Sequence, residues 1–284
     1  MRQSVFCPIK FNLTLRVLAK KDDGYHEICS LFWKKKGLDR LTITDISDDN
    51  VCDKLTIKGF TINNTNILMK TIFWARSLGC KIPPLQLELE KNMPIGSGIG
   101  GGSGNAAALI LLLKKYYGLK TSNIEISKLG SDIPFLCGES DMAEVRGIGE
   151  KIEDINHDLD FVSLLVFPKW EISTVEAYSK VDTYWQGNFS DKIKANQEVS
   201  TILGRLKRGE KIGLLPNDFF EPILEEHQEY DRAQKIAEDS DALAWGLSGS
   251  GSAFFALYKN LHKTKLAQNK FKNEYWVKQI NILE

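Results

Sequence analysis

The feature that most constrains the fold is a glycine loop joined to an apolar helix, at residues 93–113. Six glycines and two serines lie within residues 94–104, and residues 106–113 are all Ala, Leu or Ile. Glycine adopts backbone conformations that other residues avoid and leaves no Cβ between the chain and a ligand. A helix this apolar must be buried, and its first N–H groups, which lack partners inside the helix, point into the loop. The segment therefore predicts an anion site suited to phosphate.

The flanking residues define where this unit begins and ends. Apolar and polar residues alternate over residues 85–90, which predicts a half-buried strand leading into the loop. Lys114 and Lys115 place positive charge at the end of the helix, and Gly118 is suited to closing it. The order is thus strand, glycine loop and buried helix.

Four other interpretations of the loop fit less well. Gly96, Gly98 and Gly101 match a dinucleotide-binding fingerprint, but the second parallel strand with its acidic residue is missing. No Gly-Lys-Ser/Thr follows the glycines, as a Walker loop requires, and the motifs of protein kinases are absent. A flexible Gly/Ser linker is disfavoured because a patterned strand and a buried helix bracket the loop.

Composition limits the partners of the chain. The 284 residues contain 37 Lys plus Arg and 37 Asp plus Glu, so no net charge attracts the chain to nucleic acid or to an anionic membrane. Any phosphate recognition must then depend on one site and not on the net charge of the chain. No apolar run approaches the length of a membrane span. The cysteines are scattered and odd in number, which predicts a reduced, cytoplasmic protein; they are Cys7, Cys29, Cys52, Cys80 and Cys137.

Two N-terminal segments carry candidate site residues. Alternation over residues 10–17 predicts a strand with Lys10 and Asn12 on one face, although a lone strand-end lysine is more typical of a solvated surface. The sequence Asp-Asp-Gly before Tyr25 and His26 is a strong hairpin signal. Tyr25 and His26 fit either a ligand platform or an ordinary packed tyrosine beside a surface histidine.

Three later features are equally open on local grounds. Asp132 precedes Pro134 by two residues, which favours a helix N-cap worth about 1 kcal/mol, yet a carboxylate there could also accept a proton. Tyr178 fits either an aromatic wall or a core position on an amphipathic helix. The Gly/Ser turn at residues 246–252 is either a tight connection or a second set of donors for phosphate.

The coarse pattern predicts an α+β protein with two domains, divided into residues 1–155 and 156–284. Residues 147–160 are expected to be loose and acidic, before a buried strand opens the second domain. Other expected strands are 31–33, 39–44, 161–167 and 253–258. Expected helices are 67–78, capped by Thr65 or Asn66 and stopped by Gly79, then 124–129, 199–206 and 219–237, with residues 186–197 expected as a loop.

Three segments in fixed order now coincide: residues 94–103, 129–134 and 246–251. Together they resemble the small-molecule kinases named after galactose, homoserine, mevalonate and phosphomevalonate, the GHMP kinases. The opening segment 8–13 and the Asp-Gly-Tyr-His segment at 23–26 resemble the branch that phosphorylates 4-diphosphocytidyl-2-C-methyl-D-erythritol in the non-mevalonate isoprenoid pathway. The resemblance covers nearly the whole chain. It implies an N-terminal ribosomal-protein-S5-domain-2-like unit and a C-terminal ferredoxin-like unit.

The resemblance also implies a reaction, in which the ATP γ-phosphoryl group moves to the 2-hydroxyl of the erythritol moiety. Such transfer depends on alignment and charge stabilisation. Asp132 would be the base, while Lys10 would orient the hydroxyl, hold Asp132 ionised and offset charge. Tyr25, His26 and Tyr178 would hold the cytosine. The further substrate-binding residues implied are Asn12, Thr174, Ser248 and Gly249.

On the nucleotide side, the resemblance implies ATP as phosphoryl donor and Mg²⁺ with it, with no protein ligand for the metal assigned. Lys91 and Asn66 occupy positions like those beside the nucleotide. The residues that would wrap the phosphates are Pro94, Ile95, Gly96, Ser97, Gly98, Ile99, Gly100, Gly101, Gly102, Ser103 and Gly104.

Two residues depart from the family pattern, and two other functions compete with this one. Gly104 stands where the family commonly has a serine, and Tyr178 where it often has phenylalanine. The same fold could instead act on mevalonate or homoserine, or bind a nucleotide without catalysis. The presence of both Lys10 and Asp132 argues against a non-catalytic protein. The sequence does not predict an oligomeric state.

Overall fold

The computed structural model describes residues 1–22, 24–46, 52–59 and 66–283, and the chain divides into two compact units. Unit 1 comprises Met1–Ile9, Lys34–Ile95 and Gly100–Glu139, and unit 2 comprises Lys10–Trp33, Gly96–Ile99 and Ser140–Glu284. Two long strands, β1 (Arg2–Lys20) and β2 (His26–Asp45), contribute to both units. The division into residues 1–155 and 156–284 remains a prediction about the sequence.

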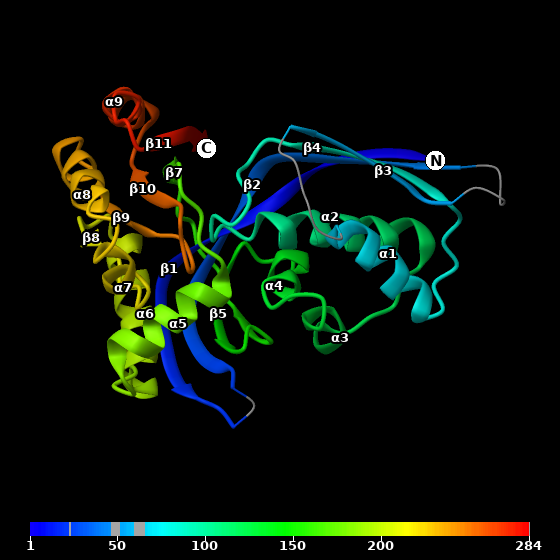
Figure 1. The fold of residues 1–284 in the computed structure, drawn as a ribbon, viewed down its shortest axis with the longest axis horizontal. Helices are drawn as coiled ribbons and strands as arrows, with labels where there is room; N and C mark the ends of the chain where they lie inside the picture. The colour runs from blue at the N-terminus through cyan, green and yellow to red at the C-terminus, as the bar shows by residue number, and fades with distance from the viewer. Residues whose placement is uncertain (23, 47–51, 60–65, 284) are drawn as a thin grey trace. The chain divides into compact units, whose positions relative to one another are not determined.

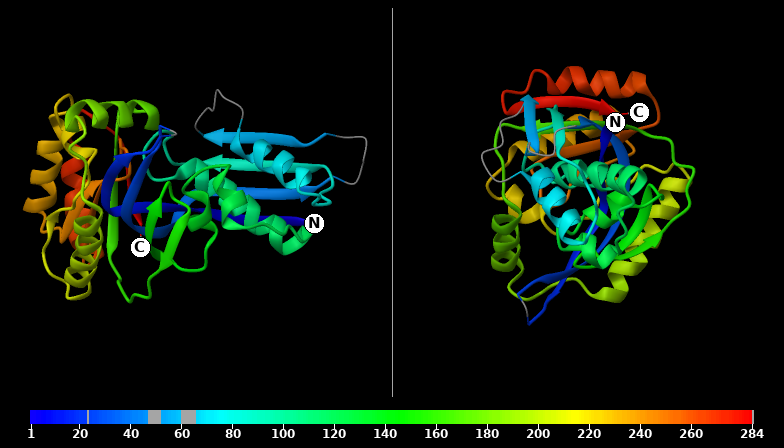
Figure 2. Two further views of the ribbon diagram at one scale, coloured as in Figure 1. Left: turned by 90° about the horizontal axis from the view of Figure 1, so that it is seen from below. Right: turned by 90° about the vertical axis from the view of Figure 1, so that its right-hand side faces the viewer.

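Unit 1 is built from strands covered by helices. Strand β4 pairs in parallel with β3 and antiparallel with residues 40–45 of β2. Helices α1 and α2 lie side by side against these strands (Figures 1 and 2), and α2 also packs against α4. The elements are β3 (Lys54–Gly59), α1 (Ile67–Ser77), β4 (Leu85–Lys91), α2 (Gly101–Tyr117), α3 (Asn123–Ser127) and α4 (Ile133–Cys137).

The predicted strand, loop and buried helix are confirmed in unit 1. The leucines of β4 are buried, and so are the Ala, Leu and Ile residues of α2 apart from Leu111, which is 41% exposed. The helix closes at Gly118, whose φ of 66° is the left-handed conformation that favours glycine. The expected cap of α1 is also confirmed, because the Asn66 side chain accepts a hydrogen bond from the Leu68 N–H. Thr65, the other candidate cap, lies outside the described residues.

Unit 2 contains a five-stranded sheet in the order β11-β7-β10-β9-β8. All pairs are antiparallel except β8 with β9. When β7, β9, β10 and β11 are numbered one to four, their order is 4-1-3-2, which confirms the expected ferredoxin-like arrangement. The strands are β7 (Val162–Pro168), β8 (Gly213–Leu214), β9 (Ala244–Leu247), β10 (Phe254–Tyr258) and β11 (Val277–Leu283).

Helices supply the core on one face of this sheet. Tyr230 on α8 and Phe271 on α9 pack with Phe254 and Tyr258 of β10, and all four are fully buried. Figure 1 shows α8 and α9 beside these strands. On the other face, the ring of Phe255 stacks on Phe11 of β1, with 5.0 Å between centroids. The helices of unit 2 are α5 (Thr174–Trp185), α6 (Lys192–Lys207), α7 (Phe220–Leu224), α8 (Glu229–Asp239) and α9 (Leu261–Phe271).

Two expectations about strands are corrected. The expected strands 31–33 and 39–44 are parts of the single strand β2. Its Gly37 lies so close to β1 that a Cβ would be 2.6 Å from the Cys7 carbonyl oxygen. The expected loose segment 147–160 instead contains half of a hairpin, in which β5 (Met142–Gly147) pairs with β6 (Lys151–Asp154). Gly147 and Gly149, both with positive φ, form its turn.

Two expectations about helices are also corrected. The expected helix 219–237 is divided into α7 and α8, because Trp170 stacks on His227 in the break and donates a hydrogen bond to Glu229. The expected loop 186–197 ends early, since Asp191 caps α6 by accepting from the Lys194 N–H. Tertiary contacts and caps thus override the composition of these segments. Within the described residues, no helix has the length and apolar character needed to cross a membrane.

Candidate active site

The glycine loop depends on backbone freedom at three alternate positions. Gly96, Gly98 and Gly100 have φ of 65°, 73° and 70°, which other residues rarely adopt. In unit 2, a Cβ on Gly98 would lie 1.9 Å from the Ser248 carbonyl oxygen and 2.8 Å from that of Gly251. The loop and the second Gly/Ser turn are therefore in direct backbone contact.

In unit 1 the loop continues into α2 earlier than expected. Gly101, Gly102, Ser103 and Gly104, predicted as loop, form the first turn of the helix. The Gly104 N–H donates to the Gly100 carbonyl oxygen at 2.7 Å, but the N-cap, Gly100, has no side chain to accept the N–H groups of residues 101–103. These N–H groups carry the positive end of the helix dipole, which favours anions, and phosphate binding here remains a prediction.

Gly104 is required by close packing inside unit 1. A Cβ at this position would lie 1.8 Å from the Pro8 carbonyl oxygen. The serine that the family commonly has there would clash with β1 unless the helix moved. At this position the main chain of α2 lies close to that of β1.

Lys91 lies at the same end of α2. Its ammonium is 3.3 Å from the position that a Cβ of Gly101 would take. It is buried and forms an ion pair with the buried Asp39. A cation at a helix N-terminus is unfavourable unless anions compensate it. Asn66, by contrast, is used as a cap, and its contribution to nucleotide binding remains a prediction.

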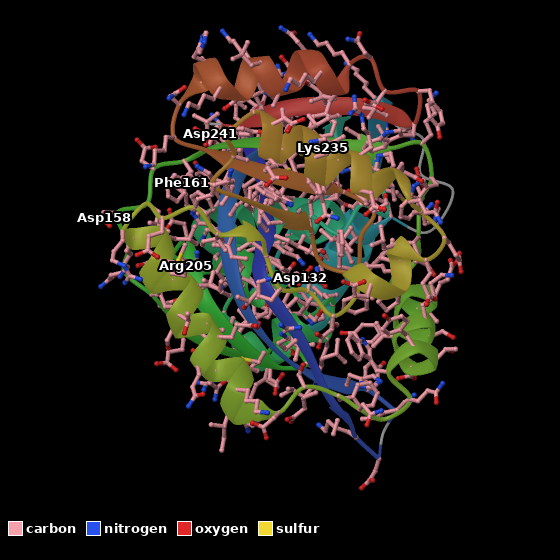
Figure 3. All side chains as sticks on the ribbon, turned by 90° about the vertical axis from the view of Figure 1, so that its left-hand side faces the viewer. Asp132, Asp158, Phe161, Arg205, Lys235 and Asp241 are labelled. Carbon is pink, nitrogen blue, oxygen red and sulfur yellow. The ribbon has the colours of Figure 1, made fainter. Side chains whose placement is uncertain are left out.

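Asp132 is the N-cap residue of α4 by position, but its side chain does not cap. It makes no hydrogen bond to the helix N–H groups, and its φ and ψ of −80° and −18° are already helical. The side-chain cap expected from local sequence is therefore wrong. Asp132 is partly exposed and is labelled in Figure 3. Two residues earlier, a Cβ on Gly130 would lie 3.7 Å from the Ser103 hydroxyl oxygen, which brings this segment to the first turn of α2.

Lys10 and Asn12 share a face of β1, as alternation predicted. The Lys10 ammonium donates to Asn12 Oδ1 at 2.7 Å and lies 4.9 Å from the centroid of the Phe32 ring. Asn12 Nδ2 in turn donates to the Ser30 hydroxyl at 2.9 Å. Both side chains are buried, so Lys10 is not the solvated lysine that its position alone would indicate. The network fixes the direction of a buried ammonium group.

The second Gly/Ser turn meets this pair within unit 2. A Cβ on Gly249 would lie 3.0 Å from Lys10 Nζ and 3.4 Å from Asn12 Oδ1. The Ser248 hydroxyl donates to the Gly98 carbonyl oxygen at 3.3 Å. The structure therefore brings together four of the predicted residues from distant parts of the sequence, with Gly98 beside them.

The predicted cytosine side comprises Tyr25 just before β2, His26 at the start of β2 and Tyr178 in α5. His26 stacks on Tyr178 with 5.6 Å between centroids, and its ring is buried. Its Nδ1 lies 2.9 Å from the Leu18 carbonyl oxygen, and its Nε2 lies 2.7 Å from Asp182 Oδ1. Both ring nitrogens face oxygen atoms of the protein itself. Tyr25 is 65% exposed, and Thr174, the first residue of α5, is exposed.

Three residues that sequence reasoning missed hold this site in place. Asp182 binds both His26 and Lys20; burial acts to raise its pKa, but these partners more than offset that effect and lower the pKa. Asn217 Nδ2 donates to the carbonyl oxygens of Leu247 and Gly249, each at 2.9 Å. The third, Asp39, holds Lys91. Asn217 carries one local signal, because its side chain accepts from the Phe219 N–H in an Asx turn.

The part of the chain that the structure describes contains no group of three or more His, Cys, Asp and Glu side chains that could hold a metal ion. In the same residues the five cysteines are free thiols. Four of the predicted loop residues differ in exposure: Pro94, Ser97 and Ile99 are buried, whereas Ile95 is 38% exposed.

The chain matches two family models, described as the GHMP kinases N terminal domain over residues 66–143 and GHMP kinases C terminal over residues 202–278. Among curated proteins, it is 31% identical over 264 residues to a 4-diphosphocytidyl-2-C-methyl-D-erythritol kinase from Porphyromonas gingivalis, covering 90% of this chain and 92% of the relative. It is 29% identical over 271 residues to the enzyme of that name from Prochlorococcus marinus, covering 90% and 86%.

Solved structures agree with these matches. A crystal structure of a 4-(cytidine 5'-diphospho)-2C-methyl-D-erythritol kinase superposes with a TM-score of 0.79 and 26% identity, covering 99% of this chain and 98% of the other. A homoserine kinase from Cytophaga hutchinsonii has a TM-score of 0.68 at 18% identity, covering 99% and 96%, which shows a shared fold. The chain is therefore a small-molecule kinase that belongs to the GHMP kinases and, within them, to the 4-diphosphocytidyl-2-C-methyl-D-erythritol kinase family.

Proposed function

We propose that this kinase transfers the γ-phosphoryl group of ATP to the 2-hydroxyl of 4-diphosphocytidyl-2-C-methyl-D-erythritol, giving the 2-phosphate and ADP. The observation that carries the proposal is the meeting, in unit 2, of Lys10 and Asn12 with the second Gly/Ser turn and with Gly98 of the glycine loop. A buried ammonium directed by an amide is suited to stabilising charge on a transferring phosphoryl group. The relatives are named as kinases of this compound.

In this proposal the phosphates of ATP are held by the first turn of α2. The N–H groups of residues 101–103 and the ammonium of Lys91 supply donors and positive charge to one place. Because Gly101 and Gly102 lack Cβ atoms, the main chain can approach the phosphates closely. The protein's role here is alignment and electrostatic stabilisation, which dominate phosphoryl transfer.

Asp132 accepts the proton of the substrate hydroxyl as the oxygen attacks the γ-phosphorus. Its carboxylate is not consumed by capping α4, and its segment lies next to Ser103 in the first turn of α2. Lys10 orients the hydroxyl and offsets the charge that develops during transfer. Both roles are taken from the matched positions in the family motifs.

Mg²⁺ is part of the proposal as a companion of ATP. Magnesium prefers oxygen ligands, keeps several waters and is commonly held by one or two carboxylates together with the phosphates of a nucleotide. The Ser103 hydroxyl, in the first turn of α2, is an oxygen ligand that would hold the ion beside the phosphates. When bound, the ion would neutralise part of the phosphate charge. Activity in the cytoplasm is also proposed.

Tyr25 and Tyr178 are proposed to hold the cytosine through their rings. Because both ring nitrogens of His26 already face protein oxygens, we expect its side chain to support Tyr178 rather than to offer a ring nitrogen to the base. A neutral, flat base needs no strong positive field, in agreement with the zero net charge of the chain.

The proposal is tested by coupled ADP release with four alcohols: the cytidylylated substrate, 2-C-methyl-D-erythritol 4-phosphate, homoserine and mevalonate. We expect turnover with the first alone. Equal rates with and without the cytidine group would refute the substrate assignment. ATP binding without any substrate-stimulated ADP release would favour the non-catalytic alternative.

Variants test the assigned roles. Lys10→Met is expected to lower kcat about 100-fold or more, as loss of one preorganised donor does. Asp132→Asn is expected to lower kcat by about 100- to 10,000-fold with little change in ATP affinity. Lys235→Met, on the exposed surface of α8 (Figure 3), is the control and should leave kcat unchanged. A near-normal kcat for Asp132→Asn would remove it as the base.

A further inference from the structure

Asp39 is a buried carboxylate in unit 1 that receives four hydrogen bonds. It lies on β2 and is 1% exposed. Its Oδ1 accepts from the main-chain N–H groups of Asn92 at 2.8 Å and Met93 at 3.0 Å. Its Oδ2 accepts from the Lys91 ammonium and from Asn105 Nδ2, the latter at 3.1 Å. Every donor comes from a segment that flanks the glycine loop.

These four donors tie together the two ends of the loop. Lys91 is the last residue of β4, and the next two residues begin the connection to the loop. Asn105 lies in the second turn of α2, beyond the loop. A single carboxylate thus links the strand before the loop to the helix after it, and sets the direction of Lys91 toward Gly101.

The surroundings make these interactions strong. The neighbouring Cys7 thiol is buried, and this burial raises its pKa to about 12. Charges in such a poorly hydrated environment interact more strongly than they do in water. The same environment makes an unpaired charge costly, so Lys91 would not remain in place without an anion beside it.

We propose that Asp39 is a positioning residue for ATP, which acts by holding the Lys91 ammonium at the first turn of α2 and by fixing the entrance of the glycine loop. The inference rests on the proposed function, because it assigns the phosphates of ATP to that turn. Asp39 touches neither substrate in this account. It therefore controls affinity for ATP rather than the rate of phosphoryl transfer.

The substitution Asp39→Asn keeps the size of the side chain but removes its charge. Whichever way the amide turns, its NH₂ group faces two donors, so two of the four hydrogen bonds are lost. Hydrogen bonds to charged groups are strong enough that we expect the Kd for ATP to rise about 10- to 100-fold. At saturating ATP, kcat should change less than about threefold, and the KM for the alcohol substrate should not change.

Asp53→Asn is the matched control. Asp53 is another carboxylate of unit 1, with a side chain that is 6% exposed, an ion pair to Arg76 and a hydrogen bond from the Leu85 N–H. Neither of these interactions involves a residue of the glycine loop. Its substitution should lower the free energy of unfolding while leaving the Kd for ATP unchanged. Calorimetric titration of ATP in the absence of acceptor, together with urea unfolding, gives both quantities for each variant.

A second test asks whether Asp39 acts through Lys91. If it does, Asp39→Asn should weaken ATP binding by a smaller factor in a Lys91→Met background than in the wild-type protein. This double variant removes both buried charges. It can therefore be used to measure ATP binding if Asp39→Asn alone fails to fold. A double variant that binds ATP with the wild-type Kd would overturn the inference.

The outcomes separate the inference from the function on which it rests. A wild-type protein that binds no ATP refutes the proposed function, and the assignment of Asp39 falls with it. If the wild-type protein binds ATP, and Asp39→Asn is less stable but binds ATP with the same Kd, only the inference about Asp39 is refuted. A raised Kd for ATP in Asp39→Asn but not in Asp53→Asn supports it.

Discussion

The contact between the glycine loop and the second Gly/Ser turn is tested by Gly98→Ala. The φ of 73° at Gly98 costs an alanine about 1–2 kcal/mol. Its Cβ would lie 1.9 Å from the Ser248 carbonyl oxygen, whereas real Cβ contacts are not shorter than 3.0 Å, so the turn must move by at least about 1.1 Å. That movement strains the hydrogen bonds that Ser248 makes with Ala253 and Gly251. At about 1 kcal/mol each, the total loss is about 3–4 kcal/mol.

The matched control is Gly187→Ala, also in unit 2. Gly187 has φ of 89° with no atom within 4 Å of its Cβ position, so an alanine there meets only the backbone strain. Urea unfolding should show the Gly98 variant about 2 kcal/mol less stable than the control. Because the displaced turn lies against Lys10, kcat should also fall by about tenfold or more. Equal free energies of unfolding and equal kcat for the two variants would show that Gly98 does not pack closely against the Ser248 carbonyl oxygen.

Three further predictions follow from unit 1. Gly104→Ser should lower the free energy of unfolding by about 2 kcal/mol or more, because the new Cβ would clash with the Pro8 carbonyl oxygen. A variant that shows no loss of stability in urea unfolding would contradict this packing. Burial acts to raise the pKa of Asp53, but its hydrogen bonds from Arg76 and the Leu85 N–H, with the charge of Arg76, outweigh burial and lower the pKa. The pair therefore stabilises the fold above about pH 4 and loses this effect at lower pH. Urea unfolding should show Arg76→Met about 2 kcal/mol less stable than the wild-type protein at pH 7, and the difference should shrink at pH 3. A difference that stays constant between the two pH values would contradict this prediction. Cys52 is the exposed cysteine, so a thiol reagent at pH 7 should label it in the folded protein, as mass spectrometry of peptides would show. Prior labelling of any other cysteine would contradict this; burial raises the pKa of each of Cys7, Cys29, Cys80 and Cys137.

Local pattern was sufficient where one physical constraint dominates. The apolar run of α2, the alternation of β4 and the cap at Asn66 each follow from a rule that operates over a few residues. The same holds for Lys10 and Asn12, since alternation alone puts them on one face of β1. The family motifs then indicated which of these residues face a ligand.

Local pattern failed where distant contacts decide the outcome. Asp132 has the sequence of a capping residue, yet its side chain makes no capping hydrogen bond. The helix expected over residues 219–237 breaks because Trp170, far away in the chain, stacks at the break. Asp39 and Asp182 carried no signal in the sequence, because a single acidic residue in a strand or helix is typical of a solvated surface.

The sequence by itself determined the glycine loop, the buried helix behind it and the kinase family, because glycine content, apolar periodicity and motif order are properties of neighbouring residues. Only the tertiary structure decided which polar side chains are buried and what pairs with them. Lys91 with Asp39, His26 with Asp182, and Asn217 with the second Gly/Ser turn are such pairs. The partners are 52 residues apart in the first pair, 156 in the second, and 30 and 32 in the third. Hydrogen bonds between them form only after the strands and helices have packed, so no window of sequence can contain them.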